Sequence, residues 1–452
     1  MALRRDGESG RGAGGEDEER GGEKDDTARA HVGPPKRRTS KSGHEDEAKI
    51  TDPTENSSGE QCRASDWTSG REIRSVADGR GATFVTGKSD KSGSVSSAGA
   101  PPSDRVGTVR AGEEFDVAAL DAWLKARVPS LSGMPRVTQF SGGASNWTYR
   151  LEYDRDDLVL RRPPAGTKAK SAHDMSREYR VQNALRPVFP YVPEMIAHCD
   201  DASVIGSEFY VMRRIDGLIP RASLGFDLDP ARTRALCERV VDTLVELHSI
   251  DPADVGLDAM DRGPGYVRRQ VEGWSDRYRR ARTWNVPKFE SVMSWLAKNG
   301  PDDGPHRVIH NDFRFDNVVL DRTDPTRVIG VLDWEMATIG DGLMDLGNSM
   351  AYWVQADDDP IGRALRRQPT HLPGMMTRRE VVERYCTRMG IRPDNWAFYE
   401  VCGAFRLAVI IQQIYYRFHH RQTRNPAFRR FWLVAHYLHW RCRTAIRKSG
   451  VA

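Results

Sequence analysis

A carboxylate, a carboxamide and a second carboxylate follow one another at a characteristic spacing in the second half of the chain. Asp312 lies in the run H-N-D-F-R-F-D-N at residues 310–317, and Asn317 closes that run. Asp333 comes after a short apolar segment further along. In phosphoryl transfer one Asp can orient and deprotonate an attacking hydroxyl, while an Asn and another Asp hold magnesium on the phosphates. These residues therefore predict phosphoryl-transfer chemistry, which is largely positioning and charge neutralisation.

The same residues also have an ordinary structural explanation. Asp and Asn commonly form turns, and Asp324-Pro325 marks a turn between the two segments in either case. The run Val328–Leu332 is rich in β-branched residues and ends at Asp333, which strengthens the chemical interpretation. It predicts a hairpin on which Asp312 and Asp333 can face each other. Magnesium prefers hard oxygen donors and keeps several waters, so two protein ligands suffice.

With these motifs the chain resembles the aminoglycoside phosphotransferase-like kinases, which have the protein-kinase-like fold. It is most similar to the branch related to the kinase domain of acyl-CoA dehydrogenase fusion proteins, from about residue 113 to the C-terminus. The resemblance implies an α+β fold of two lobes, a small antiparallel sheet lobe and a larger helical lobe. It implies that Asp312 is the catalytic Asp, that Asn317 and Asp333 bind Mg²⁺, and that His310 braces the loop. ATP and Mg²⁺ are the cofactors it implies.

Composition divides the chain of 452 residues into three parts. Residues 1–110 consist mostly of Gly, Ser and charged residues, with few clustered apolar side chains. Such a segment cannot bury enough surface to offset its chain entropy, so it is predicted to be a disordered low-complexity tail. Residues 111–216 are predicted to form the nucleotide-binding lobe. Residues 217–452 are predicted to form the helical lobe for catalysis and substrate binding.

Several classes of partner are not indicated. The net charge of +4 gives no general argument for nucleic-acid binding. No apolar run approaches the roughly twenty residues of a membrane span, and no apolar segment of a secretory signal follows the first residues. The six cysteines lack metal-site spacing and are expected to be free thiols. We expect a cytoplasmic protein that acts on a small-molecule hydroxyl, and the oligomeric state stays open.

The start of the predicted nucleotide lobe reads as a helix followed by a three-stranded meander. Phe115–Leu124 has helical spacing, and the strands are Val137–Phe140, Trp147–Tyr153 and Leu158–Arg161. The turn between the first two strands contains Ser141, Gly142 and Gly143. Glycine permits close backbone approach to phosphates, although a Gly-Gly hairpin is also an ordinary turn. Its position favours a phosphate-covering loop.

Arg161 departs from the pattern of the wider fold. The resemblance implies a Lys at the end of the third strand, which bridges nucleotide phosphates and pairs with a helical Glu. Arg can bind phosphates in a bidentate way but does not reproduce the compact charge of Lys. Glu178, in the predicted helix Ser176–Leu185, is the expected partner, and Arg162 is the next candidate for the phosphate clamp. The resemblance also implies that the backbone around Met212 contacts adenine.

The predicted helical lobe gives the best indication of the substrate. Residues 361–452 contain 18 Lys and Arg against 4 Asp and Glu. A polycationic aminoglycoside needs an acidic pocket, so this composition favours an anionic or neutral hydroxyl substrate. Arg406, Gln412 and Tyr416 are the candidate substrate residues, on a helix expected to face the cleft. Arg-rich helices can also simply present solvated faces.

Two helix residues of this lobe have expected structural roles. His248 ends a run of apolar residues at helical spacing and is expected to be a core or cap residue. Asp345 lies near the start of another predicted helix, and the resemblance implies that it braces the catalytic loop.

Three functions remain in competition. The leading hypothesis is an ATP- and Mg²⁺-dependent kinase for a small-molecule hydroxyl, such as a hydroxyacyl thioester or another anionic or neutral metabolite. An antibiotic-modifying kinase of the same fold is the first alternative, and the basic C-terminal part argues against it. A nucleotide-binding pseudokinase or scaffold is suggested by Arg161 and the long tail. The joint presence of Asp312, Asn317 and Asp333 argues against an inactive site.

Overall fold

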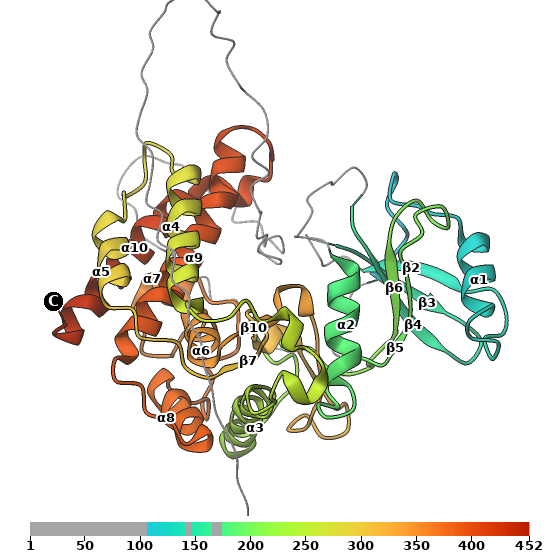
Figure 1. Cartoon of the computed structure of the whole chain (residues 1–452), viewed down its shortest axis with the longest axis horizontal. Coiled ribbons are helices and arrows are strands. Elements are labelled where there is room, and N and C mark those ends of the chain that lie inside the picture. The colour runs from blue at the N-terminus through green and yellow to red at the C-terminus, as the bar shows by residue number, and fades with distance from the viewer. Residues whose placement is uncertain (1–105, 141–145, 165–173, 452) are drawn as a thin grey trace, which may run out of the picture. The chain divides into compact units, whose positions relative to one another are not determined.

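The structure is a computed structural model that describes residues 106–140, 146–164 and 174–451. The part of the predicted tail at residues 1–105 and the loop residues Ser141, Gly142 and Gly143 lie outside the described residues. The first part of the fold is an antiparallel sheet of six strands in the order β1-β2-β3-β4-β6-β5 (Figure 1). The strands and their two helices are β1 Val106–Gly107, α1 Val117–Lys125, β2 Arg136–Phe140, β3 Trp147–Glu152, β4 Asp157–Arg162, α2 Met175–Leu185, β5 Met195–Cys199 and β6 Phe209–Arg213.

The predicted meander is confirmed, and two further strands were not predicted. β2, β3 and β4 pair antiparallel in sequence order, and β6 pairs with the other edge of β4. β5 carries a register shift between Met195 and Ala197, which breaks the alternation that identifies a strand in sequence. β1 pairs with β2 through Val106 and Gly107. The sheet therefore begins inside the segment predicted as tail, and the predicted boundary at residue 110 is a few residues late.

Alternation along β4 sends its two final arginines in opposite directions. Leu158 and Leu160 are buried with α1 residues such as Leu120 in one apolar cluster, while Val159 packs in another with Tyr210. Successive strand residues point to opposite faces of a sheet. Arg161 therefore shares the face of Val159, which is the face that α2 covers through β5 and β6.

The rest of the described chain is mainly helical and includes two small hairpin-like pairs of strands. β8 pairs with β9 in the predicted hairpin, and β7 pairs with β10. These elements are α3 Pro230–His248, α4 Tyr266–Ala281, α5 Glu290–Lys298, β7 His306–Ile309, β8 Val318–Leu320, β9 Val328–Val331, β10 Thr338–Asp341, α6 Gly342–Ala351, α7 Pro360–Ala364, α8 Arg378–Met389, α9 Trp396–His419 and α10 Phe431–Ser449. Short 3-10 turns connect them at Ala253–Val255, Asp258–Met260, Phe315–Asn317, Trp334–Met336 and Pro426–Arg430.

The predicted helices of this part are confirmed. α3 begins with Pro230, and Asp229 caps it by accepting a hydrogen bond from the Arg232 amide. The two helices between residues 265 and 299 are α4 and α5. Two apolar cores result, one around α3, β8 and β9 and one around α4, α5, α9 and α10.

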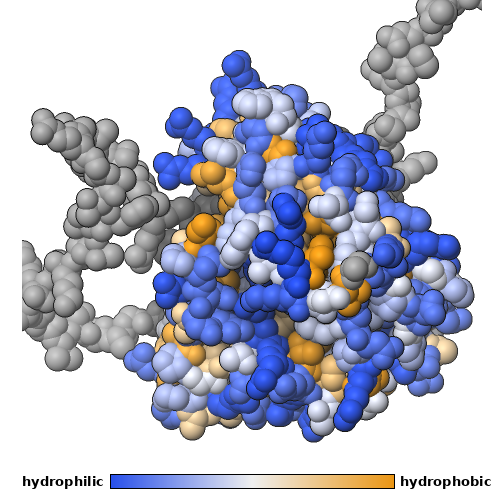
Figure 2. Space-filling model, turned by 90° about the vertical axis from the view of Figure 1, so that its left-hand side faces the viewer, coloured by the Kyte–Doolittle hydropathy of each residue, from blue (hydrophilic) through white to orange (hydrophobic). Residues whose placement is uncertain are grey.

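Helix α9 forms the centre of the second core. It is long and apolar enough by composition to cross a membrane, but 78% of its most apolar stretch is buried within the fold. That burial is the property of a core helix, and α4, α6 and α10 all contact it. Five free cysteines are buried, as predicted, and Cys62 lies outside the described residues. Figure 2 shows a surface that is mainly hydrophilic with smaller hydrophobic areas between.

The crossing of α6 and α9 depends on two glycines. A Cβ atom at Gly403 would collide with the carbonyl oxygen of Gly347, and a Cβ at Gly347 would lie 2.6 Å from the carbonyl oxygen of Tyr399. The two helix backbones therefore touch, and neither position has room for a side chain. This contact sets the distance between α6 and α9.

We predict that Gly403→Ala lowers the free energy of unfolding by about 1–3 kcal/mol, because the new methyl group must separate two helix backbones. Gly273→Ala in α4 is the matched control, since its Cβ would meet only the end of Arg277 at 3.8 Å. There the higher helix propensity of Ala should stabilise the protein by roughly 0.5–1 kcal/mol. Urea denaturation of both variants tests this, and equal effects would contradict the proposed close crossing.

Candidate active site

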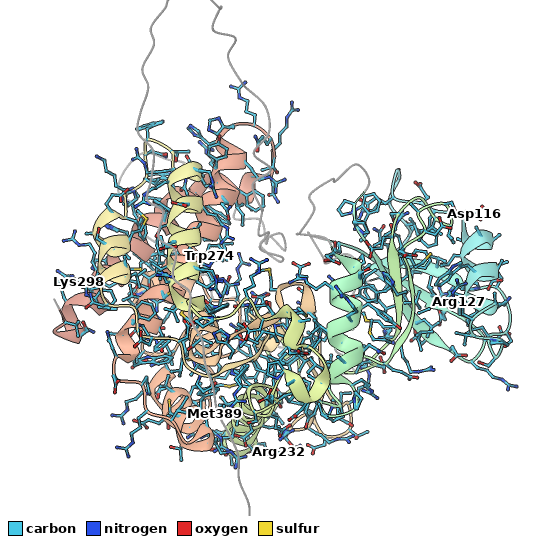
Figure 3. The ribbon with its side chains drawn as sticks, in the orientation of Figure 1. Asp116, Arg127, Arg232, Trp274, Lys298 and Met389 are labelled. Atoms are coloured by element: carbon cyan, nitrogen blue, oxygen red, sulfur yellow. The ribbon has the colours of Figure 1, made fainter. Side chains whose placement is uncertain are left out.

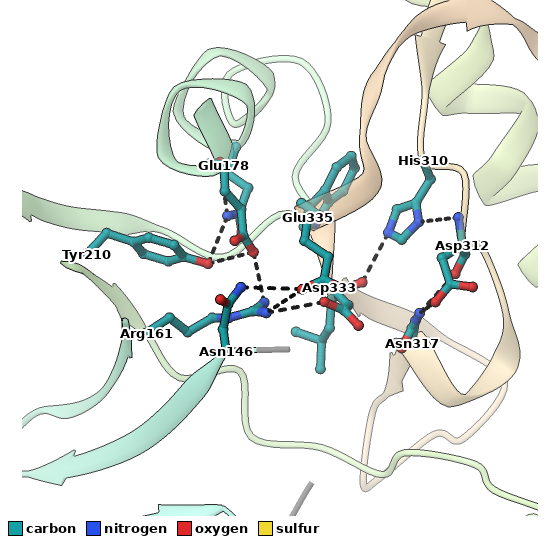
Figure 4. Close-up of polar contacts among 12 residues, drawn as sticks. Asn146, Arg161, Glu178, Tyr210, His310, Asp312, Asn317, Asp333 and Glu335 are labelled. Atoms are coloured by element: carbon teal, nitrogen blue, oxygen red, sulfur yellow. Dashed lines mark hydrogen bonds and ion pairs between the residues drawn. The ribbon is translucent and has the colours of Figure 1, made fainter. Parts of the chain in front are cut away.

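His310 connects the two segments that carry the candidate catalytic residues. Its side chain is fully buried, and burial lowers its pKa, so the imidazole is neutral at physiological pH. Nε2 donates a hydrogen bond of 3.0 Å to the Leu332 carbonyl, and Nδ1 accepts one of 3.3 Å from the Asp312 amide (Figure 4). His310 thus ties the residue before Asp333 to Asp312. The predicted bracing contact is confirmed.

Asp345 anchors the same loop from α6. Its Oδ2 atom accepts hydrogen bonds from the His310 amide at 2.8 Å and from His248 Nε2 at 3.1 Å. Burial alone would raise the pKa of this carboxyl, but the hydrogen bond and charge of His248 hold the pKa below its ordinary value. His248 is itself held by the Tyr385 hydroxyl at 2.7 Å. Asp345 braces the loop and His248 is a core residue, as predicted.

Asp312, Asn317 and Asp333 come together where the loop meets the β8–β9 hairpin. Asn317 Nδ2 donates to the Asp312 carbonyl at 2.8 Å and to Asp312 Oδ2 at 3.2 Å. The Leu332 amide donates to the Asn317 carbonyl at 2.8 Å, so Asn317 and Asp333 lie on facing ends of the hairpin. The side chains of Asp312 and Asp333 are each about one-fifth exposed, which leaves them accessible to a ligand.

Two of these side chains offer oxygen atoms that suit Mg²⁺. The amide nitrogen of Asn317 is occupied by Asp312, which directs its oxygen away from that residue. Within the described ranges no hydrogen bond reaches Asn317 Oδ1 or Asp333 Oδ2. Hard oxygen donors of this kind fit magnesium, which keeps several of its own waters.

The backbone is in the left-handed region at two positions beside these groups. Asn311 has a φ of 63° and Asp333 a φ of 67°. Short polar side chains tolerate this conformation better than other non-glycine residues, but it still costs free energy. At Asn311 the side chain is held by hydrogen bonds to the Met336 carbonyl and from Asn348 Nδ2, each of 3.2 Å. Strained conformations of this kind concentrate at functional sites.

Arg161 is held by three carboxylates. Its guanidinium lies 2.8 Å from Glu178 Oε1, 3.3 Å from Asp333 Oδ1 and 3.6 Å from Glu335 Oε2 (Figure 4). The predicted pairing with Glu178 is confirmed. The Tyr210 hydroxyl donates a further hydrogen bond of 2.8 Å to Glu178. Burial raises the pKa of Glu178, and the charge of Arg161 opposes that rise.

Two other predicted residues, Gln412 and Tyr416, do not lie beside Asp312. Gln412 was predicted to face the substrate, but it is fully buried and donates to the Ala281 carbonyl and the Thr283 hydroxyl. It holds the end of α4, so this prediction is wrong. Tyr416 packs on His420 near the end of α9. It is about 15 Å along the helix from Arg406 at 1.5 Å per residue, and its contact with a substrate stays a prediction.

The roles predicted for Arg162 and Met212 have different outcomes. Arg162 donates to the carbonyls of Ile205, Glu113 and Glu114 on the opposite face of the sheet from Arg161. It is a structural residue and not a reserve phosphate clamp. Met212 is buried near the end of β6, and its contact with adenine stays a prediction.

Arg314 and Glu335 are site residues that the sequence analysis did not identify. Arg314 NH2 donates to Asp312 Oδ2 at 3.1 Å, and its guanidinium lies over the Tyr352 ring at 4.8 Å. Glu335 contacts Arg161 and accepts a hydrogen bond of 3.3 Å from Asn146. Both follow a predicted site Asp by two positions, and that proximity was the available signal.

Arg406 is the one predicted substrate residue that the structure places beside the site. Its NH1 atom donates to the Asn311 carbonyl at 2.8 Å, one residue from Asp312. Its guanidinium also lies 5.2 Å from the ring of Trp274 on α4, which Figure 3 labels.

Comparisons with known proteins agree with this geometry. The model of the phosphotransferase enzyme family matches residues 136–381. Acyl-CoA dehydrogenase family member 11 of Rattus norvegicus is 36% identical over 313 residues, which are 68% of this chain and 40% of that protein. Acyl-CoA dehydrogenase family member 10 of Mus musculus is 36% identical over 66% of this chain and 28% of that protein. The chain thus spans well under half of these relatives.

Solved structures show the same fold. A protein of Ralstonia eutropha JMP134, described as a candidate aminoglycoside phosphotransferase, has a TM-score of 0.65 and 28% identity. The match covers 74% of this chain and 99% of that one. Choline kinase of Cryptosporidium parvum has a TM-score of 0.50 at 11% identity, covers 74% and 97% of the two chains, and shares the fold.

We predict that Arg161→Met lowers the free energy of unfolding by roughly 3–5 kcal/mol, because it leaves Glu178 buried without its cation. Adding Glu178→Gln should recover much of that loss. Loss of Arg161 raises the folded-state pKa of Glu178 further above its ordinary value of 4.5. Below that value the Glu178 carboxyl is protonated in both the folded and the unfolded state. The loss of unfolding free energy in Arg161→Met should therefore be small near pH 4 and grow as the pH rises.

Urea denaturation between pH 4 and pH 8 measures this dependence. Arg213→Met is the matched control, since Arg213 is an exposed strand-end arginine that pairs with the exposed Glu194 and the half-buried Asp156. It should cost no more than about 1 kcal/mol. If the loss of unfolding free energy in Arg161→Met does not change with pH and is not reduced by Glu178→Gln, the assigned pairing of Arg161 with Glu178 is contradicted.

Proposed function

The chain belongs to the phosphotransferase enzyme family, and we propose that it is an ATP- and Mg²⁺-dependent kinase for a small-molecule hydroxyl. The observation that carries this proposal is the convergence of Asp312, Asn317 and Asp333 at one end of a hairpin, with Arg161 on the Asp333 side. A screen for ADP release over hydroxy acids, acyl-CoAs, sugars and aminoglycosides tests it. The proposal would be contradicted if none of the hydroxyl compounds in this screen is phosphorylated.

Asp312 is the group that would receive the substrate hydroxyl. Its Oδ2 atom is fixed by Asn317 and Arg314, so the carboxylate has a defined orientation. It would accept a hydrogen bond from the hydroxyl and take up the proton as the oxygen attacks the γ-phosphate. His310 and Asp345 hold the loop backbone, so this carboxylate needs no rearrangement to reach that position.

The charged groups around Asp333 would serve the nucleotide phosphates. Mg²⁺ held by Asn317 and Asp333 would neutralise charge on the phosphates during transfer. Arg161 is aligned by Glu178 and lies next to Asp333, which supports a role as phosphate clamp. Its planar guanidinium suits bidentate contact with phosphate oxygens.

The substrate is proposed to be an anionic or neutral metabolite with a hydroxyl group, such as a hydroxy acid or a hydroxyacyl thioester. Arg314 contacts the Asp312 carboxylate and Arg406 contacts the carbonyl of the preceding Asn311, and these cations disfavour a polycationic acceptor such as an aminoglycoside. The relatives named for acyl-CoA dehydrogenation suggest an acyl compound. An inactive scaffold would have no chemical need for the ordered hydrogen bonds of Asp312 and Asn317. We place the reaction in the cytoplasm.

We predict that Asp312→Asn lowers turnover by at least about 10²-fold, the usual scale of lost general-base assistance. Nucleotide affinity should stay nearly unchanged, because the amide keeps the shape and the contacts to Asn317. Asp324→Asn, in the exposed turn of the same hairpin, is the matched control and should keep full turnover. Comparable turnover of Asp312→Asn and the control would refute the catalytic role.

Asp333→Ala is predicted to remove the magnesium dependence of nucleotide binding. The variant loses a carboxylate ligand while Asn317 stays in place. The test is a nucleotide titration at several magnesium concentrations, followed by calorimetry. An affinity that rises with magnesium as it does in the unchanged protein would refute the metal role of Asp333.

A further inference from the structure

Arg406 is a buried cation that the described part of the chain does not neutralise. Its residue is 7% exposed, and no carboxylate of the described residues lies within ion-pair distance. Its one hydrogen bond there is the 2.8 Å contact from NH1 to the Asn311 carbonyl. Arg161 and Arg314 are buried to a similar degree, but each of them has carboxylate partners. A buried charge without a partner is costly, so the Arg406 guanidinium is arranged for a missing anion.

The guanidinium lines a small pocket that is partly open to solvent. Arg406 is the only charged residue among the described lining residues, which otherwise supply polar groups, aromatic faces and the side chains of two methionines and a cysteine. Gln270, Asn348 and Tyr266 provide the polar groups, and the Trp274 ring covers one side of the guanidinium. An aromatic face keeps an Arg in place without consuming its hydrogen-bond donors.

The pocket reaches the backbone next to the catalytic Asp312. Asn311, which lines it, directly precedes Asp312 and is fixed by Asn348 through a hydrogen bond of 3.2 Å. A group held by Arg406 would therefore belong to the same small molecule as a hydroxyl at Asp312.

We propose that Arg406, with Gln270 and Asn348, forms a subsite that binds an oxyanion of the acceptor substrate, a carboxylate or a phosphate, close to the phosphorylated hydroxyl. This inference rests on the proposed kinase function and adds the charge of the acceptor. Arg binds both oxyanions through paired N–H donors, so the two sources share one chemistry. The competing explanation is that Arg406 only fastens α9 to the catalytic loop.

Ligand binding to the full chain without nucleotide separates these explanations. Calorimetry would compare 2-, 3- and 4-hydroxybutyrate with the corresponding hydroxybutyramides, which have the same shape but no charge. Glycerol 3-phosphate against glycerol tests phosphate in the same way, and choline is the cationic control. The variants are Arg406→Gln, which can still donate to Asn311, and Arg406→Lys. Met336→Glu adds a carboxylate to the pocket lining while keeping Arg406.

In the unchanged protein at least one oxyanion should bind about tenfold or more tightly than its neutral partner, as expected for charge-assisted hydrogen bonds. This preference should disappear in Arg406→Gln, persist in part in Arg406→Lys, and disappear in Met336→Glu without a loss of melting temperature. Whether the carboxylate or the phosphate shows the stronger preference identifies which oxyanion the subsite binds.

Four results would overturn the subsite. They are equal affinity for acids and amides, no binding of any oxyanion, a preference that survives Arg406→Gln, or tighter binding of choline. The proposed function fails separately. If oxyanion binding depends on Arg406 but no acceptor compound causes release of ADP, the proposed subsite is supported and the proposed kinase function is not. If phosphoryl transfer occurs but does not depend on Arg406, the proposed kinase function is supported and the proposed subsite is not.

Discussion

The carboxylate of Asp345 has no exposure to solvent, and the geometry of the candidate site depends on it. Removing a carboxylate from water is costly unless hydrogen bonds replace its hydration. His248 and the His310 amide supply those bonds, and they come from α3 and from the end of β7. One anion therefore fixes three elements relative to one another. The His310 ring extends this order to Leu332, so both carboxylate-bearing segments take their positions from the same buried charge.

The sheet is joined to this framework by a second and different kind of contact. Arg161 on β4 and Arg177 on α2 bridge to the segment around Asp333 and Glu335 through ion pairs and hydrogen bonds to carbonyls. The Arg161 contacts are largely buried, so the cost of removing these charges from water offsets much of their attraction. They align Arg161 beside Asp333, and they also make each of these two groups the ion-pair partner of the other.

Sequence reasoning identified the parts of the site that short-range spacing determines. The positions of Asp312, Asn317 and Asp333 follow from one loop and one hairpin, and the Arg161–Glu178 pair follows from strand and helix order. Residues on α9 were less predictable because the sequence does not say which neighbours cover each face of a helix that is buried almost all round. Arg406 faces the site, whereas Gln412, six residues later, faces the end of α4. The strand β5 escaped prediction because a bulge interrupts its alternation.

The backbone contact between Gly347 and Gly403 separates what is rigid in this protein from what can be rearranged. α6 carries Asp345 and α9 carries Arg406, and their direct contact leaves no compressible side chain between them. The loop anchor and the oxyanion pocket therefore behave as one solid unit, whose recognition geometry is ready before any acceptor arrives. Arg161, by contrast, is already held by three carboxylates, and an incoming phosphate would compete with them for its guanidinium. The acceptor would thus meet a preformed pocket, whereas the nucleotide phosphates would compete with carboxylates for Arg161.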